Sequence, residues 1–340
     1  MPSLPPLDIK TNTNYAPHVV ILGAGASLAA FPNGDSAGRL LPLMRNLIEI
    51  VGLEPLLARE GIAGPIHDFE SFYDELASVP ENGALLREME SAIREYFLEL
   101  QIPNHVTLYD KLLLSLREKD LIATFNWDPF LAQAYRRNIQ IKKLPYIVFL
   151  HGNVEIGVCV EHRKKGFIFH RCSECGEWLT PSTLLYPVKH KNYNADQFIS
   201  NEWEILRWHL KRAYLVTIFG YSAPVTDTEA RELMINEWRA NPTVELAQID
   251  IVDIRPRADL ETAWRDFFVR QHFGIYANAL DTYLFRHPRR TCDAFAMATL
   301  QQAPWRENPL LDTPDLAELQ RWLAPLLEEE ESGTLSGKPC

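Results

Sequence analysis

The chain has 340 residues, of which 46% are hydrophobic and 23% are charged, and its formal net charge is −11 at pH 7. This composition is typical of a globular protein with an ample core, and the length suits about two domains or one large domain with an insertion. The negative charge argues against general nucleic-acid binding, because contacts to phosphates require a basic face.

Cysteine usage and hydropathy bear on the cellular compartment. The five cysteines are an odd number, and two of them form a C-x-x-C pair, which favours reduced thiols over a disulfide framework. No signal-peptide pattern opens the chain, and no uninterrupted apolar run reaches the length of a membrane span. We therefore expect a cytoplasmic protein without a membrane segment.

The first regular element is predicted after an arm of residues 1–16, which is rich in proline and polar residues and is expected to be disordered. The stretch from His18 to Ala30, HVVILGAGASLAA, indicates a buried strand, a tight glycine turn and the start of a helix. Leu28 stands where a third glycine is usual, so a turn that serves packing alone is one interpretation. The other is a phosphate cradle of backbone N–H groups, with the candidate contacts Gly23, Ala24, Gly25, Ala26 and Ser27.

Helical patterns dominate the next part of the chain. Residues 31–39 read as a loop placed to fold over a ligand at the first turn, and residues 40–57 alternate in a helical manner. Helices are also predicted within residues 68–100 and over residues 106–118. An apolar stripe at three-to-four spacing in the 68–100 segment is assigned to the core: Leu85, Leu86, Met89, Ile93, Tyr96, Phe97 and Leu100.

Four further strands are predicted, at residues 121–125, 146–150, 214–219 and 248–252. Each ends in a polar or glycine-bearing turn, and most are separated by helical stretches long enough for crossover connections. This pattern predicts an α/β fold with a doubly wound, Rossmann-like parallel sheet. Ligands of such sheets bind outside the carboxyl ends of the strands, where we expect four further turns to converge, those that begin at Asn126, His151, Gly220 and Asp253.

The segment 152–192 does not fit the pattern of the sheet. Two x-x-spaced pairs of metal-ligand residues are separated here by a short ribbon, which matches the spacing of a structural zinc site closed by four protein ligands. The candidate ligands are Cys159, His162, Cys172 and Cys175. A reduced surface C-x-x-C beside an unrelated cysteine is the alternative interpretation, and His170 is an alternative fourth ligand.

The C-terminal part reads as mostly helical. A helical pattern runs from residue 258 to about 271, and a final helical region covers residues 291–327 after an aromatic-rich stretch. Residues 328–340 start with four glutamates and end in serine, glycine and proline. This composition predicts a disordered acidic tail.

Taken in order, the motifs resemble those of the sirtuin family in its broad sense. GAGAS at Gly23 resembles the family's first glycine turn, and TFNWD at Thr124 resembles its T-Q-N-x-D strand end. LHGN at Leu150 resembles its H-G motif, GYSAP at Gly220 resembles its G-T-S turn, and the zinc ribbon follows His151 as in that family. The resemblance implies NAD as ligand and a sirtuin-like Rossmann domain over residues 17–290, with a helical insertion at about 60–118 and a zinc-ribbon module at about 152–192.

Two departures from the family pattern bear on activity. FPNGDSAGR stands where deacylating sirtuins carry G-I-P-D-F-R, and LLYPVKHKNY replaces their peptide-binding stretch. GYSAPVTDTEA, which includes Asp227, is similar to the sirtuin-like domains of bacterial defence proteins that destroy NAD. The resemblance therefore implies an NAD hydrolase, acting as an antiviral defence effector that depends on homo-oligomerisation or on an activating protein partner.

Roles follow for individual residues. Cleavage of the nicotinamide–ribose bond passes through an oxocarbenium-like transition state and needs a base, orienting polar groups and a dry pocket. His151 is the candidate base, and Asn126 is the candidate to hold the attacking water or a ribose hydroxyl. The ordinary alternative is that both only hydrogen-bond their turns. Further predicted cofactor contacts are Asp128, which braces the Asn126 loop, and Gly220, Tyr221, Ser222, Asp227 and Asp253.

Two other functions remain open at this point. An NAD-dependent protein deacylase would use His151 to activate a ribose hydroxyl. A non-catalytic module would bind NAD or ADP-ribose and regulate a partner. The pairing of Asn126 with His151 favours catalysis, because binding alone does not require it.

Overall fold

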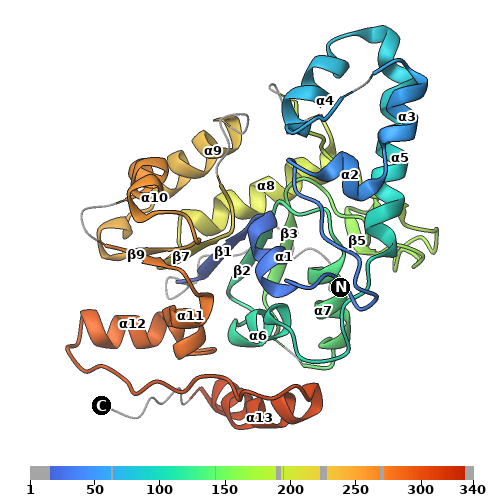
Figure 1. The fold of residues 1–340 in the computed structure, drawn as a ribbon. Helices are drawn as coiled ribbons and strands as arrows, with labels where there is room; N and C mark the ends of the chain where they lie inside the picture. Colours follow the sequence, from blue (N-terminus) through green and yellow to red (C-terminus); the bar gives the residue numbers. More distant parts are fainter. Residues whose placement is uncertain are drawn as a thin grey trace.

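The computed structural model describes residues 16–62, 64–141, 143–188, 193, 195–222, 228–268 and 272–333. A six-stranded sheet forms the centre, and a smaller three-stranded sheet and a group of helices lie to one side of it (Figure 1). The predicted fold class, a doubly wound α/β sheet with a helical insertion and a small ribbon module, is confirmed. Most of the predicted N-terminal arm lies outside the described residues, and no helix within them is long and apolar enough to cross a membrane.

The central sheet has the strand order β3-β2-β1-β7-β8-β9, and every neighbouring pair is parallel. Its strands are β1 (His18–Leu22), β2 (Leu121–Thr124), β3 (Tyr146–Phe149), β7 (Leu215–Phe219), β8 (Gln248–Val252) and β9 (Phe273–Tyr276). The five predicted strands are confirmed to within one residue at each end. β9 was not predicted from the sequence, because this edge strand is only half-buried and contains Gly274, so it lacks a continuous apolar run.

The strand order reverses between β1 and β7. The chain moves outward from β1 to β2 and β3 on one side, and from β7 to β8 and β9 on the other. The main helices beside these paths are α1 (Ala24–Ala30), α6 (Leu108–Ser115), α7 (Phe130–Arg137), α8 (Gln197–Leu210) and α9 (Thr228–Arg239). α6 contacts both α1 and α7, whereas α8 contacts α9. Because crossovers between parallel strands are right-handed, the two groups cover opposite faces, and the crevice outside β1 and β7 is the expected ligand position.

A helical insertion projects from the sheet at the upper right of Figure 1. It consists of α2 (Leu47–Val51), α3 (Glu54–Arg59), α4 (Phe69–Ala77), η1 (Pro80–Asn82) and α5 (Gly83–Glu99). The buried residues of α5 are Leu85, Met89, Ile93 and Phe97, as the apolar stripe predicts. The helix predicted over residues 40–57 is wrong for residues 40–46. Pro42 disfavours helix before it, and Gly52, at φ +79°, separates α2 from α3.

The smaller sheet lies within residues 152–192 and is antiparallel. Its strand order is β5-β4-β6, with β4 at Ile156–Cys159, β5 at Lys164–Phe167 and β6 at Thr180–Pro181. We call this module the ribbon. A buried ion pair ties it to the central layer, because Lys165 Nζ donates to Glu202 of α8 at 2.8 and 2.7 Å and to the Ile147 carbonyl of β3 at 2.7 Å.

The remaining C-terminal elements are η3 (Val244–Leu246), α10 (Arg257–Trp264), η4 (Arg265–Phe267), η5 (Ala279–Asp281), α11 (Tyr283–Arg286), α12 (Thr291–Thr299) and α13 (Leu316–Ser332). α12 and α13 lie at the opposite end of the molecule from α3 and α4, whereas α10 lies near α9 (Figure 1). The predicted disorder from residue 328 is wrong up to Ser332, where α13 ends. Glu330 anchors this turn, because its buried carboxylate accepts hydrogen bonds from Arg289 and Arg290 at 2.6 to 2.8 Å.

Candidate functional site

Three glycines lock the turns after β1 and β7 together at the reversal point. Gly23 N–H donates to the Phe219 carbonyl at 3.0 Å, and Gly25 N–H donates to the Gly220 carbonyl at 2.9 Å. A Cβ atom on Gly25 would lie 2.8 Å from Gly220 Cα, and one on Gly220, whose φ is +62°, would lie 2.2 Å from the Ala26 nitrogen. We call Gly23, Gly25 and Gly220 the glycine seam. Its glycines are required for packing whatever ligand the turn meets.

A buried cluster of polar side chains lies beside the glycine seam. Its members come from α1, α6 and the turn after β2, and none is more than 8% exposed: Ser27, Tyr109, Asn126 and Asp128. Asn126 Nδ2 donates to the Gly23 carbonyl at 2.9 Å and to Ser27 Oγ at 3.0 Å. Ser27 Oγ lies 2.6 Å from the Tyr109 hydroxyl and donates to Asp128 Oδ2 at 2.6 Å. We call these four residues the polar cluster.

Two consequences follow for the chemistry of the polar cluster. Burial raises the pKa of Asp128 to about 6, although the Ser27 hydroxyl and the Phe130 N–H oppose this rise. Burial also raises the pKa of Tyr109 well above its ordinary value, so its hydroxyl keeps its proton. Among the described residues, none donates a hydrogen bond to Asn126 Oδ1, which leaves this oxygen to accept one from a ligand or a water.

The H-G turn after β3 is held tightly against its surroundings. Gly152 has φ +77°, and a Cβ atom there would lie 1.8 Å from the Thr183 carbonyl oxygen, so only glycine fits. Asn153 Nδ2 donates to the Asp128 carbonyl at 2.7 Å and to the Asn126 carbonyl at 3.3 Å. Asn153 thereby fixes the turn that carries Asn126 to the turn that carries His151.

His151 lies in an aromatic pocket and is 7% exposed. Its ring meets Phe125 edge-on, with ring centroids 4.9 Å apart, and its Nε2 lies 3.3 Å from the Tyr193 hydroxyl. Phe125, the residue before Asn126, stacks in turn on Tyr221 at 4.2 Å. Predicted site residues from the ends of β2, β3 and β7 are therefore brought together through Phe125.

The remaining predicted cofactor contacts are less closely joined to this centre. Ala24 and Ser222 are exposed, Ala26 is buried in α1, and Asp227 lies outside the described residues. Asp253 directly follows β8, but its carboxylate is engaged by Arg255, which donates from its backbone N–H at 2.9 Å and from its guanidinium at 3.0 and 2.9 Å.

The loop of residues 31–39 folds onto the end of α5. Asp35 accepts hydrogen bonds from the backbone N–H groups of Ala37, Arg39 and Gln101 at 2.8 to 3.1 Å. Burial alone would raise the pKa of Asp35, but these N–H groups and the Arg39 guanidinium hold it below its ordinary value. The loop is therefore anchored by its own carboxylate. Whether it covers a ligand at the glycine turn stays a prediction.

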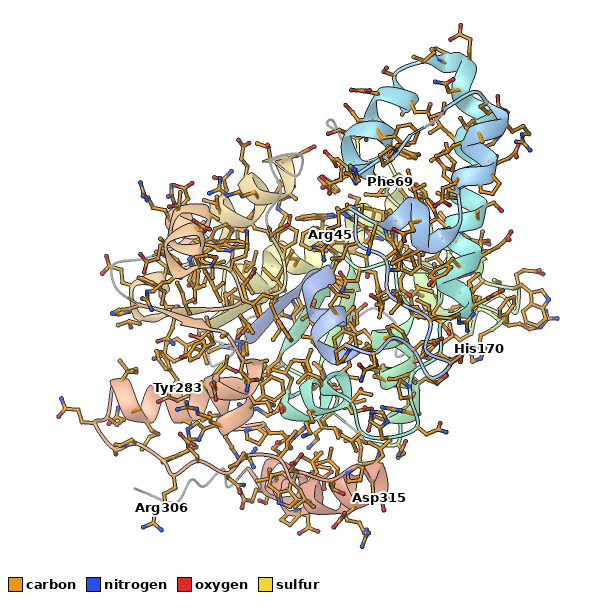
Figure 2. All side chains as sticks on the ribbon, viewed as in Figure 1. Arg45, Phe69, His170, Tyr283, Arg306 and Asp315 are labelled. Carbon is orange, nitrogen blue, oxygen red and sulfur yellow. The ribbon has the colours of Figure 1, made fainter. Side chains whose placement is uncertain are left out.

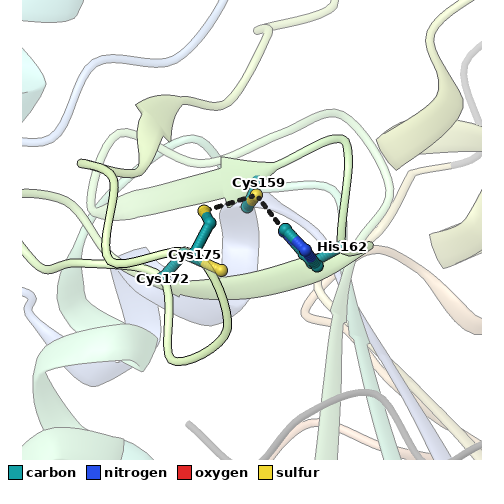
Figure 3. A group of neighbouring side chains, drawn as sticks. All are labelled: Cys159, His162, Cys172 and Cys175. Carbon is teal, nitrogen blue, oxygen red and sulfur yellow. Dashed lines mark hydrogen bonds between the residues drawn. The ribbon is translucent and has the colours of Figure 1, made fainter.

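The four candidate zinc ligands gather at one end of the ribbon. Figure 3 shows Cys159, His162, Cys172 and Cys175 turned toward one another, and their ligand atoms all lie within 4.8 Å of one another. His170, the alternative ligand, is exposed at the outer side of the ribbon (Figure 2) and is not part of this group. Backbone N–H groups of Cys175 and Glu174 lower the pKa of Cys172 to about 7, which favours the thiolate that binds metals.

The spacing of these atoms fits a zinc ion. A tetrahedron with zinc–sulfur bonds of about 2.3 Å has edges of about 3.8 Å. The Sγ atoms of Cys159 and Cys175 are 3.9 Å apart, and Cys159 Sγ lies 3.5 Å from His162 Nδ1. Three sulfurs and one nitrogen would fill all four positions, so a bound zinc would hold the ribbon together and leave no open position for substrate.

Two members of the site were missed or left without a role in the sequence analysis. Tyr109 sits in a helix whose other apolar residues are core, so nothing in the sequence separates it from a packing residue. Asn153 stands in the LHGN motif. An amide side chain directly after a strand-end glycine is a signal from which its role in joining the two turns could have been predicted.

No family model and no curated protein matches this chain. The chain is similar to solved Sir2 structures. One is Sir2 in complex with the inhibitor EX-527, 2′-O-acetyl-ADP-ribose and a deacetylated p53 peptide, at 17% identity over 84% of this chain and 93% of that chain, with a TM-score of 0.39. Another is a Sir2 homologue in complex with NAD, at 13% identity over 84% and 90% of the two chains, with a TM-score of 0.39. Because these values are low, the functional assignment below rests on the residues of this chain.

Proposed function

We propose that this chain binds NAD at the carboxyl edge of its parallel sheet and hydrolyses the nicotinamide–ribose bond to give nicotinamide and ADP-ribose. The observation that carries the proposal is the pairing of Asn126 with His151. The two residues follow neighbouring strands, β2 and β3, and Asn153 and Phe125 join their turns. The pair lies beside the glycine seam, where a doubly wound sheet binds its ligands.

The chemistry of this bond suits the residues present. An oxocarbenium-like transition state needs little covalent help, but it needs an oriented water and a group that accepts its proton. Asn126 Oδ1 is directed to accept a hydrogen bond from that water or from a ribose hydroxyl. His151 is the base in this proposal. The rings of Phe125 and Tyr193 against it, with Tyr221 stacked on Phe125, keep bulk water away.

The stretch after the second cysteine pair favours water over a peptide as the acceptor. Leu185 N–H donates to the His151 carbonyl at 2.9 Å. The Tyr186 ring stacks on Tyr73 of α4 at 5.2 Å and lies 4.9 Å from the Trp127 ring, and its hydroxyl donates to the Glu90 carbonyl of α5 at 3.1 Å. The stretch that departs from the deacylase pattern thus covers the turn beside Asn126, and the helical insertion covers it in turn.

Nicotinamide release from NAD by the purified full chain tests the proposal. We expect Asn126→Ala and His151→Ala each to lower turnover by about 100-fold or more, since each removes an orienting or proton-accepting group. His170→Ala removes an exposed histidine outside the zinc group and is the matched control, with unchanged turnover. Equal turnover in all variants would refute the assignment of the site.

The same assay separates the alternatives. Strong acceleration of NAD consumption by an acyl-lysine peptide would favour a deacylase. NAD binding without turnover at any pH or NAD concentration, in wild type and His151→Ala alike, would favour a non-catalytic module. Because an unrestrained NAD hydrolase depletes its own cell, the proposal includes control by homo-oligomerisation or a protein partner, and a defence effector is the role that we propose for it.

A further inference from the structure

We propose that Tyr109 is a positioning residue for this reaction: its hydroxyl, which contacts both Ser27 Oγ and Asn126 Nδ2, helps to hold the Asn126 amide so that Oδ1 faces the substrate. The inference rests on the proposed function. It also has its own structural content, namely the orientation of one side-chain amide, which is measurable without turnover.

The number of protons on each group fixes the direction of the hydrogen bonds. Asn126 Nδ2 carries two protons and directs them to the Gly23 carbonyl at 2.9 Å and to Ser27 Oγ at 3.0 Å, with a longer contact of 3.4 Å to the Tyr109 hydroxyl. Ser27 has a single hydroxyl proton, and Asp128 Oδ2 accepts it at 2.6 Å. The Ser27 oxygen is therefore left as an acceptor only. It follows that Tyr109 is the donor in the 2.6 Å contact with Ser27.

This arrangement excludes the flipped amide. Turning Asn126 by 180° would set Oδ1 against the Gly23 carbonyl oxygen and against a Ser27 oxygen that has no proton to offer. Removing the Tyr109 hydroxyl takes away the donor that polarises Ser27 Oγ and a longer contact of 3.4 Å to Asn126 Nδ2, so the Asn126 amide keeps its orientation but is held less firmly. A loosely held amide places the water or ribose hydroxyl less accurately, which slows the chemical step more than it weakens binding.

Tyr109 itself is held by contacts outside the nucleotide-binding motifs. Its helix α6 starts with a capping box of Thr107 and Asp110, and Asp110 also accepts from Arg137 Nε at 2.6 Å and Asn138 Nδ2 at 2.9 Å. The Tyr109 ring meets Phe31 edge-on at 5.6 Å. The hydroxyl therefore has a fixed position from which it orders Ser27.

The chain of bonds works only while Asp128 is ionised. A protonated Asp128 would offer a proton to Ser27, whose own proton would then turn toward Tyr109 and reverse the chain. Burial raises the pKa of Asp128 to about 6, which places this reversal within an accessible pH range. Ser27 of α1, Tyr109 of α6 and the Phe130 N–H of α7 face the carboxylate, and among the described residues no cation does.

Tyr109→Phe tests the inference, and Tyr214→Phe is the matched control. Tyr214 is also buried, and its hydroxyl has no partner among the described residues. We expect Tyr109→Phe to lower kcat for nicotinamide release by about 10-fold with KM changed less than about twofold. The acidic limb of its pH profile should move to higher pH, because Ser27 becomes a weaker donor to Asp128 once Tyr109 no longer polarises it. A smaller fraction of folded protein alone would lower the rate at every pH without moving the acidic limb of the pH profile.

A second measurement keeps the inference testable if the wild type does not turn NAD over. The side-chain amide resonances of Asn126, assigned by their loss in Asn126→Ala, should shift and broaden in Tyr109→Phe and stay unchanged in Tyr214→Phe. If Tyr109→Phe does not fold, Ser27→Ala breaks the same chain and should give the same signature. Unchanged Asn126 resonances in a folded Tyr109→Phe or Ser27→Ala variant would overturn the inference, whether or not the protein hydrolyses NAD.

Discussion

Two buried carboxylates, Glu202 and Asp128, are stabilised in different ways. Glu202 has its own cation, since Lys165 Nζ contacts both of its oxygens at 2.8 and 2.7 Å, and the Phe149 N–H adds a bond at 2.8 Å. Asp128 is held by neutral donors only, the Ser27 hydroxyl at 2.6 Å and the Phe130 N–H at 3.2 Å. A paired charge fixes the ribbon to the sheet, whereas an unpaired carboxylate leaves a titratable group beside Asn126.

The largest effect on stability is expected from breaking the ion pair between Lys165 and Glu202. Lys165→Met leaves Glu202 buried without a cation, and we expect the free energy of unfolding to fall by about 3–5 kcal/mol in urea titrations. The double variant Lys165→Met/Glu202→Gln should regain part of this loss. Lys164→Met removes only the exposed pair with Glu174 and should cost less than about 1 kcal/mol. Equal costs for the two lysines would show that burial does not distinguish them.

Removing one of the four candidate zinc ligands tests whether a metal ion holds the ribbon together. Cys172→Ser should release the metal and lower the free energy of unfolding by about 2–4 kcal/mol, a part of the binding free energy of a structural zinc. Metal content by a colorimetric chelator and urea unfolding measure the two outcomes. His170→Ala should keep both the metal and the stability. Loss of zinc from His170→Ala would contradict the choice of His162 as the fourth ligand.

Removing the charge of the unpaired carboxylate of Asp128 should raise the free energy of unfolding, whereas breaking the Lys165–Glu202 pair should lower it. Because the pKa of Asp128 is raised to about 6 in the folded state, folding favours its protonated form. This contribution is fully present below the unfolded pKa near 4 and is lost as the pH rises through about 6. At pH 8, Asp128→Asn should therefore be at least as stable as wild type, by up to about 3 kcal/mol, with no such gain at pH 4. Nicotinamide release at pH 8 should fall in the same variant, and a variant that loses stability equally at both pH values would contradict the unpaired state of Asp128.

The structure could be predicted from the sequence where the local residue pattern and the tertiary environment agree. Val19–Leu22 is apolar throughout and is buried on both faces, so its strand was predictable, and with it the turn that follows. The strand-end rule then placed Asn126 and His151 at one edge without any information on their contacts. These residues are the part of the site that a linear pattern encodes.

Contacts between distant parts of the chain were not predictable in this way. Tyr109 meets Ser27 across 82 positions of sequence, and within its own helix it looks like any other packing residue. His162 is three residues from Cys159 and His170 is two residues from Cys172, so sequence distance does not separate them, and the path of the ribbon turn decides which one faces the cysteines. The helical turn at residues 328–332 depends on Arg289 and Arg290, which no local acidic pattern reveals.

The glycine seam bears on how this fold changes over evolutionary time. A methyl group at Gly23, Gly25 or Gly220 would come within 2.2 to 2.8 Å of atoms of the opposing turn, so an alanine at any one of these positions pushes the two halves of the sheet apart. Purifying selection on folding alone therefore retains these glycines. A descendant of the proposed NAD hydrolase that no longer bound nucleotide would still carry GAGAS, and loss of the proposed catalysis would be recorded by changes at Asn126, His151 and Tyr109.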